Sequence, residues 1–264
     1  SLHELSKTLN KQNLTIMKKT IIALMALAGA ASAETTVLWD LDFESTGVVV
    51  KTAEGVTTNL SSGVGASLIE NGAITLNNNS FSFSQTAGRL SYADEFTLVA
   101  VVQLGASQPN SWPAMFGLGE DNSWCWKPSF YVATGTFNLD KDGFGSANET
   151  NKSVGGVTYT LPSEGYGDIV TIALQNDGNG KLSLYVDDVL AGYSTIGNAS
   201  DYGSNKLINN FTFGARNGGS NKANIILHDA QFVSGLVTAP IPEPTTATLS
   251  LLALAGLAAR RRRK

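Results

Sequence analysis

Apolar and polar residues alternate in short runs through most of the chain. In the clearest run, Leu182, Leu184 and Val186 are separated by single residues, so all three would point to one face of a strand. Within the body of the chain, no apolar pattern with a period of about 3.6 residues is sustained. Gly, Asn, Asp and Ser separate the runs, as in turns between strands. The pattern predicts strands over residues 37–43, 73–76, 96–104, 114–118, 130–133, 157–161, 169–174, 181–186, 189–193, 207–213 and 224–233.

Two of these runs form a predicted hairpin. Residues 169–174 are followed by a turn sequence rich in Asn and Gly at 176–180, and then by the alternating run at 181–186. Asp187 and Asp188 would turn the chain again into residues 189–193. Many short strands separated by such turns are typical of a sandwich, so we predict an all-β domain of antiparallel strands.

The first 33 residues have a different pattern, which predicts a leader. Met17 is followed by two lysines, an apolar stretch at 21–30 and the small residues Ala31, Ser32 and Ala33. A basic start, an apolar middle and a small-residue end are the three parts of a secretory signal peptide, here a short helix that signal peptidase would remove after Ala33. We therefore interpret residues 17–33 as the signal peptide and residues 1–16 as an over-extended start.

The C-terminal segment, residues 239–264, contains an apolar run followed by basic residues. Residues 245–259 carry no charge, and as a helix they would span about 22 Å, less than the roughly 30 Å hydrocarbon core of a membrane. Arg260, Arg261, Arg262, Arg263 and Lys264 would stay on the cytoplasmic side. We expect a marginal membrane anchor with the rest of the chain on the other side. The alternative is a hydrophobic helix docked on the protein's own core.

Pro242, Glu243 and Pro244 precede this apolar run. The order of triplet, apolar run and basic end resembles the PEP-CTERM sorting signal of Gram-negative bacteria that produce exopolysaccharides. The resemblance implies that an exosortase-like enzyme cuts the chain near the triplet. It also implies transient anchoring in the inner membrane and a final location on the cell surface, in the outer envelope or in the extracellular matrix. We therefore expect an exported protein that meets the membrane only through this tail.

Composition narrows the classes of partner that we expect for the body of the chain, residues 34–239. Residues 34–239 contain 9 Lys and Arg against 20 Asp and Glu, a net charge of −11, whereas the whole chain carries −4. An acidic body repels phosphate backbones and anionic headgroups, so we expect no nucleic-acid or membrane-surface partner, and divalent cations and neutral glycans remain. Cys125 is the only cysteine, which excludes an intrachain disulfide, and we expect its thiol to be buried beside Trp124 and Trp126.

Several segments of the body resemble the concanavalin A-like lectin and glucanase fold in its laminin-G-like form. They are LWDLDFES at 38–45, DEFTLVAVVQL at 94–104, DIVTIALQNDGNGKLSLYVDDVLAGY at 168–193 and NNFTFGARNGGSNKANIILHDAQFVS at 209–234. The resemblance covers about residues 37–237 and implies one jelly-roll sandwich over residues 34–238. Lectins, adhesion modules and hydrolases share this sandwich, so the resemblance indicates a fold and not an activity.

Asp40, Asp42 and Glu44 are the first candidates for chemistry. Carboxylates two residues apart project from one face of a strand, and sandwich glycosidases use such a pair as nucleophile and general acid. The three residues open the domain, however, where laminin-G-like chains commonly have an acidic first strand, so we interpret them as a solvated strand face. His228 is the only histidine of the body, so no Ser-His-Asp or multi-histidine site can form there, and we expect a structural histidine whose hydrogen bonds are satisfied within the fold.

A second candidate is a calcium loop that begins at Asn138. Oxygen ligands at positions 1, 3, 5, 9 and 12, with Gly at position 6 and a backbone carbonyl at position 7, are the pattern of the loop that winds around Ca²⁺. In this chain those positions hold Asn138, Asp140, Asp142, Gly143, Phe144, Ser146 and Glu149. The alternative is a polar hairpin loop in which Asp, Lys and Gly supply turn chemistry.

A third candidate is a sugar-binding site in the stretch that holds three of the four tryptophans. Indole rings stack on the apolar faces of sugars, and neighbouring polar groups bind the sugar hydroxyls. The residues concerned are Trp112, Asp121, Asn122, Trp124, Trp126, Lys127 and Tyr131. Alternatively, Trp124 and Trp126 place both rings in the core.

These patterns together predict an exported, non-enzymatic protein that binds carbohydrate or glycoprotein through a laminin-G-like sandwich. Two alternatives remain open: a glycoside hydrolase of the concanavalin A-like class, and a structural matrix or adhesion component without a small ligand. Calcium is the only cofactor that the sequence indicates.

Overall fold

The computed structural model describes residues 35–52, 57–60, 66–84, 90–119, 124–143, 152–153, 157–195, 207–216 and 218–237. All of them belong to one compact unit, residues 31–237. Most lie in strands, and the helical element among them is a single 3₁₀ turn, η1 (Ala66–Leu68). The prediction of an all-β body is therefore confirmed. The predicted signal helix and C-terminal helix lie outside the described residues, and no helix within them is long and apolar enough to cross a membrane.

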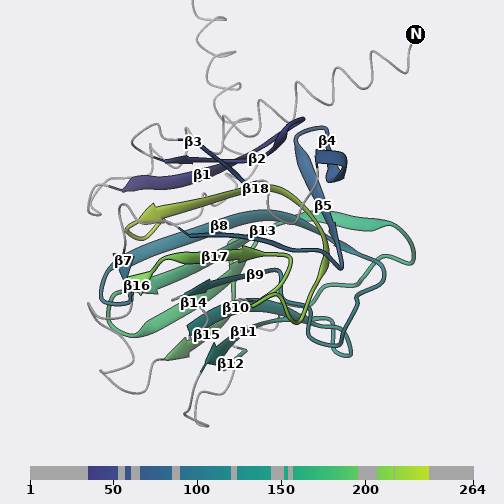
Figure 1. The fold of residues 1–264 in the computed structure, drawn as a ribbon. Helices are drawn as coiled ribbons and strands as arrows, with labels where there is room; N and C mark the ends of the chain where they lie inside the picture. Colours follow the sequence, from purple (N-terminus) through teal and green to yellow (C-terminus); the bar gives the residue numbers. More distant parts are fainter. Residues whose placement is uncertain are drawn as a thin grey trace, which may run out of the picture. The chain divides into compact units, whose positions relative to one another are not determined.

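The larger sheet contains eleven strands of the described part, and every pair in it is antiparallel (Figure 1). Its main order is β12–β15–β14–β13–β8–β18–β1–β2–β3, with β5 beside the first half of β18 and β4 beside β5. The strands are β1 (Thr36–Glu44), β2 (Gly47–Thr52), β3 (Thr57–Leu60), β4 (Ile69–Glu70), β5 (Ala73–Asn77), β8 (Glu95–Gly105), β12 (Lys152–Ser153), β13 (Tyr166–Asp177), β14 (Lys181–Val186), β15 (Val189–Thr195) and β18 (Asn224–Ser234).

The smaller sheet has five strands in the order β11–β10–β9–β17–β6, again all antiparallel. They are β6 (Phe81–Ser84), β9 (Phe116–Gly119), β10 (Trp124–Tyr131), β11 (Thr136–Gly143) and β17 (Asn210–Phe213). A separate pair joins β7 (Leu90–Ser91) to β16 (Leu207–Ile208). Apolar side chains of the larger sheet and the smaller sheet form one buried cluster, which confirms the prediction of an antiparallel sandwich.

The predicted hairpin is present and is longer than expected. β13 pairs with β14 in a register that places Ile172 opposite Val186 and Leu174 opposite Leu184, and all four side chains are buried. Asp187 and Asp188, with φ angles of 46° and 67°, then turn the chain into β15. Two consecutive positive φ angles are the geometry of the tight hairpin turn that matches the twist of the flanking strands.

The centre of the core is the ring of Trp39, which is fully buried. It meets Phe83 and Phe211 of the smaller sheet edge-to-face, with centroids 5.1 and 4.9 Å away, and it stacks on Phe232 of β18 at 5.9 Å. Edge-to-face and offset-stacked pairs are the favourable arrangements of aromatic rings. One side chain of β1 therefore packs against both sheets at once.

The first strand and the last strand of the described part are held beside each other. Thr36 lies opposite Ser234, and its backbone N–H donates to Ser234 Oγ at 3.1 Å. After β18, Gly235 adopts a φ of 86° and the chain turns across the outer face of the larger sheet. We call Gly235–Val237 the strap.

Hydrogen bonds fasten the strap to two strands of the larger sheet. Thr97 Oγ1 on β8 donates to Gly235 O at 3.0 Å and accepts from Val237 N at 3.0 Å. Gln175 Nε2 on β13 donates to Val237 O. Thr97 is fully buried, so both of its hydrogen bonds are shielded from water.

Replacing Thr97 by Val should lower the free energy of unfolding by about 1–3 kcal/mol, because Val keeps the shape but leaves the strap's N–H and C=O groups without their partner. Urea unfolding measures this. Thr171→Val is the control, since Thr171 lies on the same face and the structure shows no hydrogen bond from its hydroxyl; we expect a change within about 0.5 kcal/mol. Equal losses in the two variants would contradict the role of the strap.

Candidate functional site

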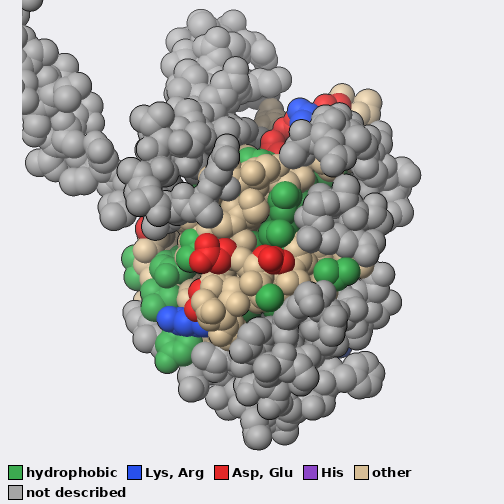
Figure 2. Space-filling view, turned by 90° about the vertical axis from the view of Figure 1, so that its left-hand side faces the viewer, with side chains coloured by type: hydrophobic (Ala, Val, Ile, Leu, Met, Phe, Trp, Pro, Cys, Tyr) green, Lys and Arg blue, Asp and Glu red, His purple; other side chains and the backbone are tan. Residues whose placement is uncertain are grey.

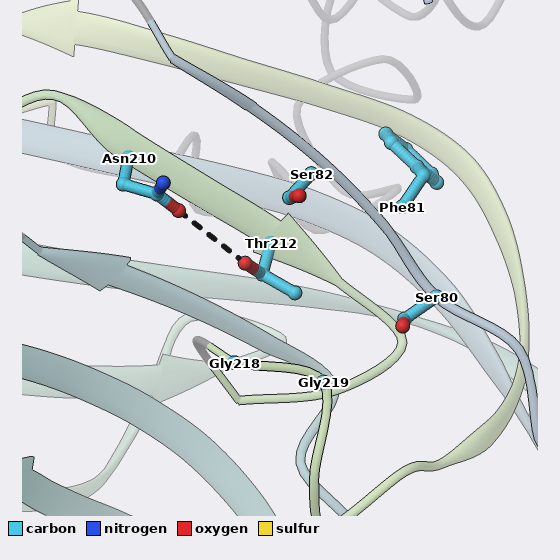
Figure 3. A pocket seen from close by; sticks show the side chains of 7 residues that line it. All are labelled: Ser80, Phe81, Ser82, Asn210, Thr212, Gly218 and Gly219. Carbon is cyan, nitrogen blue, oxygen red and sulfur yellow. Dashed lines mark hydrogen bonds between the residues drawn. The ribbon is translucent and has the colours of Figure 1, made fainter. Parts of the chain in front are cut away.

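A hollow of about 270 Å³ opens on the smaller sheet (Figure 3). Two strands and one loop form it: β6 with the residue before it, β17, and the turn that follows β17. The described residues that line the hollow are Ser80, Phe81, Ser82, Asn210, Thr212, Gly218 and Gly219. Residues 80–82 and 210–219 are far apart in the sequence and are brought together by the pairing of β6 with β17.

Strand alternation explains why the hollow is polar. In β6, Phe81 and Phe83 are buried and Ser82 is exposed. In β17, Phe211 and Phe213 are buried, so Asn210 and Thr212 take the opposite face. Ser82 lies directly opposite Thr212 in the sheet, and this pair forms the middle of the hollow.

Two polar side chains of β17 are oriented by a contact between them. Thr212 Oγ1 donates to Asn210 Oδ1 at 3.5 Å, as the dashed line in Figure 3 shows. Asn210 Nδ2 in turn donates to Ser84 Oγ at 3.5 Å across the pair of strands. Both bonds are long and are therefore weak.

The loop at the rim of the hollow is a tight turn closed by its own backbone. Gly219 N donates to Arg216 O at 2.9 Å, and Arg216 N donates to Ser220 O at 3.0 Å. Gly218 and Gly219 have φ angles of 82° and 77°, which side chains rarely adopt. A Cβ at Gly218 would meet nothing within 4 Å, so the glycine is required by the backbone and the space beside it is open.

The chemistry of the hollow is that of hydroxyl and amide groups. Ser and Thr hydroxyls both donate and accept hydrogen bonds, and the Asn amide offers donors on one side and an acceptor on the other. None of the described lining residues carries a titratable group. Such a lining can bind an uncharged, hydroxyl-rich molecule, and its described residues supply no nucleophile and base for a reaction.

The structure separates the aromatic residues that the sequence grouped together. Trp112 stacks on Tyr131, with ring centroids 4.2 Å apart and an interplanar angle of 18°. Tyr131 is the last residue of β10 and Trp124 is the first, so about 23 Å of extended strand lies between them. Trp112 and Trp124 therefore cannot contact one sugar. Asp121 and Asn122, and the side chains of Trp124, Cys125 and Trp126, lie outside the described part.

Lys127 was expected to bind sugar hydroxyls, but its side chain is only 2% exposed. It belongs to the outer face of β10, because the core residue Phe130 is three positions further along the strand. Its direct partner in the sheet is the backbone position of Asp140 on β11. A lysine this deeply buried is rarely found without a counter-charge inside the protein. We therefore expect the ammonium group of Lys127 to be paired within the fold and not to bind a ligand.

The calcium prediction for Asn138–Gly143 depends on a wound loop, and the structure has a strand there instead. β11 pairs with β10 without interruption, from Thr136 opposite Tyr131 to Gly143 opposite Trp124. Alternate residues of a strand are about 6.6 Å apart, so Asn138 and Asp142 are separated by about 13 Å, too far to share one ion. Asn138 Nδ2 donates to Thr136 O at 3.0 Å.

For the other proposed calcium ligands, the described part of the structure shows no alternative arrangement around an ion. Phe144, Ser146 and Glu149 lie outside the described residues, and so do the side chains of Asp140 and Asp142. Among the described residues, no group of three or more His, Cys, Asp or Glu side chains is arranged to hold a metal ion. Calcium binding stays a prediction, but the wound loop from Asn138 is not its geometry.

The acidic residues of β1 lie on the outer face of the larger sheet, away from the hollow. Trp39, Leu41 and Phe43 alternate with them and are buried. Lys51 of β2 forms an ion pair with Asp42, and this hydrogen bond raises the pKa of Lys51. The interpretation of these carboxylates as a solvated strand face agrees with this arrangement.

His228 is a hydrogen-bonded strand residue, as predicted. It lies at the bulge between Leu227 and Asp229 of β18. Its Nε2 is 2.6 Å from Gln103 Oε1, and Gln103 Nε2 donates to Gly167 O at 2.6 Å. Because an amide oxygen can only accept, Nε2 carries the proton of the imidazole.

The sequence contained one signal for the hollow that its spacing alone did not reveal. FSFS at 81–84 and NFTF at 210–213 both alternate phenylalanine with small polar residues. Each pattern predicts a strand with one aromatic and one polar face. Neither segment indicates that β6 and β17 are neighbours, and this pairing places Ser82 opposite Thr212.

Comparison with known proteins identifies a shared fold. No protein-family model and no curated protein matches the chain. Among solved structures, the botulinum neurotoxin serotype G binding domain is similar at 15% identity and a TM-score of 0.50, covering 77% of this chain and 49% of that one. Trypanosoma rangeli sialidase is similar at 14% identity and a TM-score of 0.53, covering 87% of this chain and 37% of that one. At these identities the likeness is one of fold, and this chain spans less than half the length of either protein.

Asn138→Ala tests the strand geometry. We expect the variant to lose about 1 kcal/mol of stability with its hydrogen bond to Thr136 and to show the same change in melting temperature on addition of Ca²⁺ as the unmodified protein. Thermal unfolding with Ca²⁺ and with a chelator measures both. A Ca²⁺ response that the unmodified protein shows and the variant lacks would restore Asn138 as a ligand.

Proposed function

We propose that this chain is a non-enzymatic carbohydrate-binding protein, a laminin-G-like sandwich of the concanavalin A-like class that binds a neutral glycan or glycoprotein in the hollow. The observation that carries the proposal is the uncharged polar lining on an otherwise acidic body. Hydroxyl and amide groups pair with sugar hydroxyls in both donor and acceptor roles, which fixes the orientation of a sugar ring.

The charge of the body favours a neutral glycan over an anionic one. Residues 34–239 carry a net charge of −11, which repels anionic ligands. Figure 2 shows one face on which acidic side chains are distributed among apolar and uncharged ones within the described part. None of the described lining residues of the hollow is basic, and the guanidinium of Arg216 in the rim turn donates to Ser220 Oγ.

A glycoside hydrolase is the alternative activity. It would need two facing carboxylates about 5–10 Å apart in the site. The described lining supplies hydroxyls and an amide in that position, and Asp40 and Asp42 belong to the other sheet. These observations support binding without hydrolysis.

The ends of the chain extend the proposal to location. A signal peptide at 17–33 and a PEP-CTERM-like tail with Pro242, Glu243 and Pro244 support export, processing by signal peptidase and an exosortase-like enzyme, and residence on the cell surface or in the extracellular matrix. The protein would then meet glycans of the polymer matrix in which it resides. The alternative of a structural matrix component requires no ligand in the hollow.

A glycan array with Ca²⁺ and with a chelator tests the proposal, with Ser82→Tyr as the decisive variant. Tyr is well tolerated in strands, and at position 82 its ring would occupy the hollow. We expect binding of a neutral glycan and a loss of at least about tenfold in affinity for this variant.

Ser45→Tyr is the matched control, because Ser45 is exposed in the turn between β1 and β2 of the larger sheet and does not line the hollow. Its affinity should stay within about twofold of the unmodified protein. If no neutral glycan binds in either condition, or if both variants lose affinity equally, the hollow is not the binding site.

A further inference from the structure

A second feature on the same face of the smaller sheet is suited to contact a sugar. Trp112 and Tyr131 form a stacked pair at the end of β10, and both side chains are partly exposed. Tyr131 follows the core residue Phe130, so it belongs to the outer face, the face of Ser82 and Thr212. Beside it, Val132 is 38% exposed, which adds apolar surface at this point. We call Trp112 and Tyr131 the aromatic platform.

The loop at the rim of the hollow also holds the segment that carries Trp112. Gly218 and Gly219 line the hollow, and two residues further Asn221 O accepts from Ala114 N at 2.7 Å. Asn110 Nδ2 donates to Lys222 O at 2.6 Å, and Asn110 Oδ1 accepts from Trp112 N at 2.9 Å. The hollow and the platform are therefore joined through one hydrogen-bonded loop.

The sheet register gives the distance between the two features. Thr212 lies opposite Gly117, and Trp112 precedes Gly117 by five residues. An extended chain rises about 3.3 Å per residue, so the two features are at most about 17 Å apart along the strand, with one strand spacing of about 4.8 Å between them. A span of up to this length has room for a chain of several sugars.

We propose that the binding site takes an extended neutral glycan, with one sugar in the hollow and a later sugar of the same chain stacked on Trp112. This inference rests on the proposed function of the hollow. The two features match the two surfaces of a sugar: the hydroxyl edge meets the Ser, Thr and Asn groups, and the apolar ring face meets the indole. The site is therefore one for an internal stretch of a polysaccharide, and a lone terminal sugar would use only half of it.

Chain length is the variable that tests this inference. A series of neutral oligosaccharides of the glycan class found on the array, from the monosaccharide to the hexasaccharide, is titrated into the purified protein by calorimetry. We expect affinity to rise with length until the chain spans both features. Trp112→Ala should lower affinity for the long members about tenfold and leave the monosaccharide unchanged, and Trp112→Phe should restore most of the loss.

Two comparisons separate this inference from the proposed function. Ser82→Tyr should weaken binding at every length, and Tyr185→Ala, which removes a partly exposed aromatic ring from the other sheet, should weaken none. If Trp112→Ala proves unstable in urea unfolding, Trp112→Leu, which removes the indole face but keeps an apolar side chain beside Tyr131, takes its place.

Each outcome has one meaning. Affinity that is independent of length, or a Trp112→Ala effect of equal size at all lengths, overturns the extended site and leaves the hollow as a site for a single sugar. If the unmodified protein binds no neutral oligosaccharide of any length, both proposals are overturned. A length-dependent loss confined to Trp112→Ala and restored by Trp112→Phe supports the extended site.

Discussion

The packing of Trp39 between the two sheets is the contact on which the rest of the structure depends. Its ring is carried by β1, between β18 and β2, and it touches Phe83 and Phe211 of the smaller sheet. Alternate residues of a strand take opposite faces, so the packing that places these two phenylalanines in the core also places Ser82 and Thr212 on the opposite face of the sheet. The polar face that β6 and β17 present to the hollow thus follows from the aromatic core, and the glycine turn after β17 completes the rim.

The fold was more predictable than the site because the two depend on different kinds of information. Period-two alternation in runs such as Leu182, Leu184 and Val186 is local, and it was enough to predict the antiparallel sandwich and many of its strands, but not β2, β6 or β11. The hollow depends on which strands are neighbours. Ser82 and Thr212 are separated by most of the domain in sequence, and only the pairing of β6 with β17 brings them together.

Spacing misled the prediction where one pattern serves two structures. Polar residues at alternate positions, as at Asn138, Asp140 and Asp142, describe the start of a calcium loop and equally one face of a strand. The pairing of β11 with β10 decides for the strand. Closeness in sequence was also misleading for Trp112 and Trp124. Trp112 stacks on Tyr131 at the end of β10, and Trp124 is at the start of that strand, a full strand length away.

The pairing of Thr36 with Ser234, near the two ends of the described part, has a mechanical consequence. Because β1 and β18 are antiparallel and both ends of the domain leave from the same end of this pair, a pull between them would open the pair one residue at a time and would not load its hydrogen bonds together. The strap lies between Ser234 and any tether at the C-terminus, and the bonds of Thr97 and Gln175 would carry the load first. If the domain were pulled by its C-terminal tail, the strap at Gly235–Val237 would thus bear the force before the two sheets do.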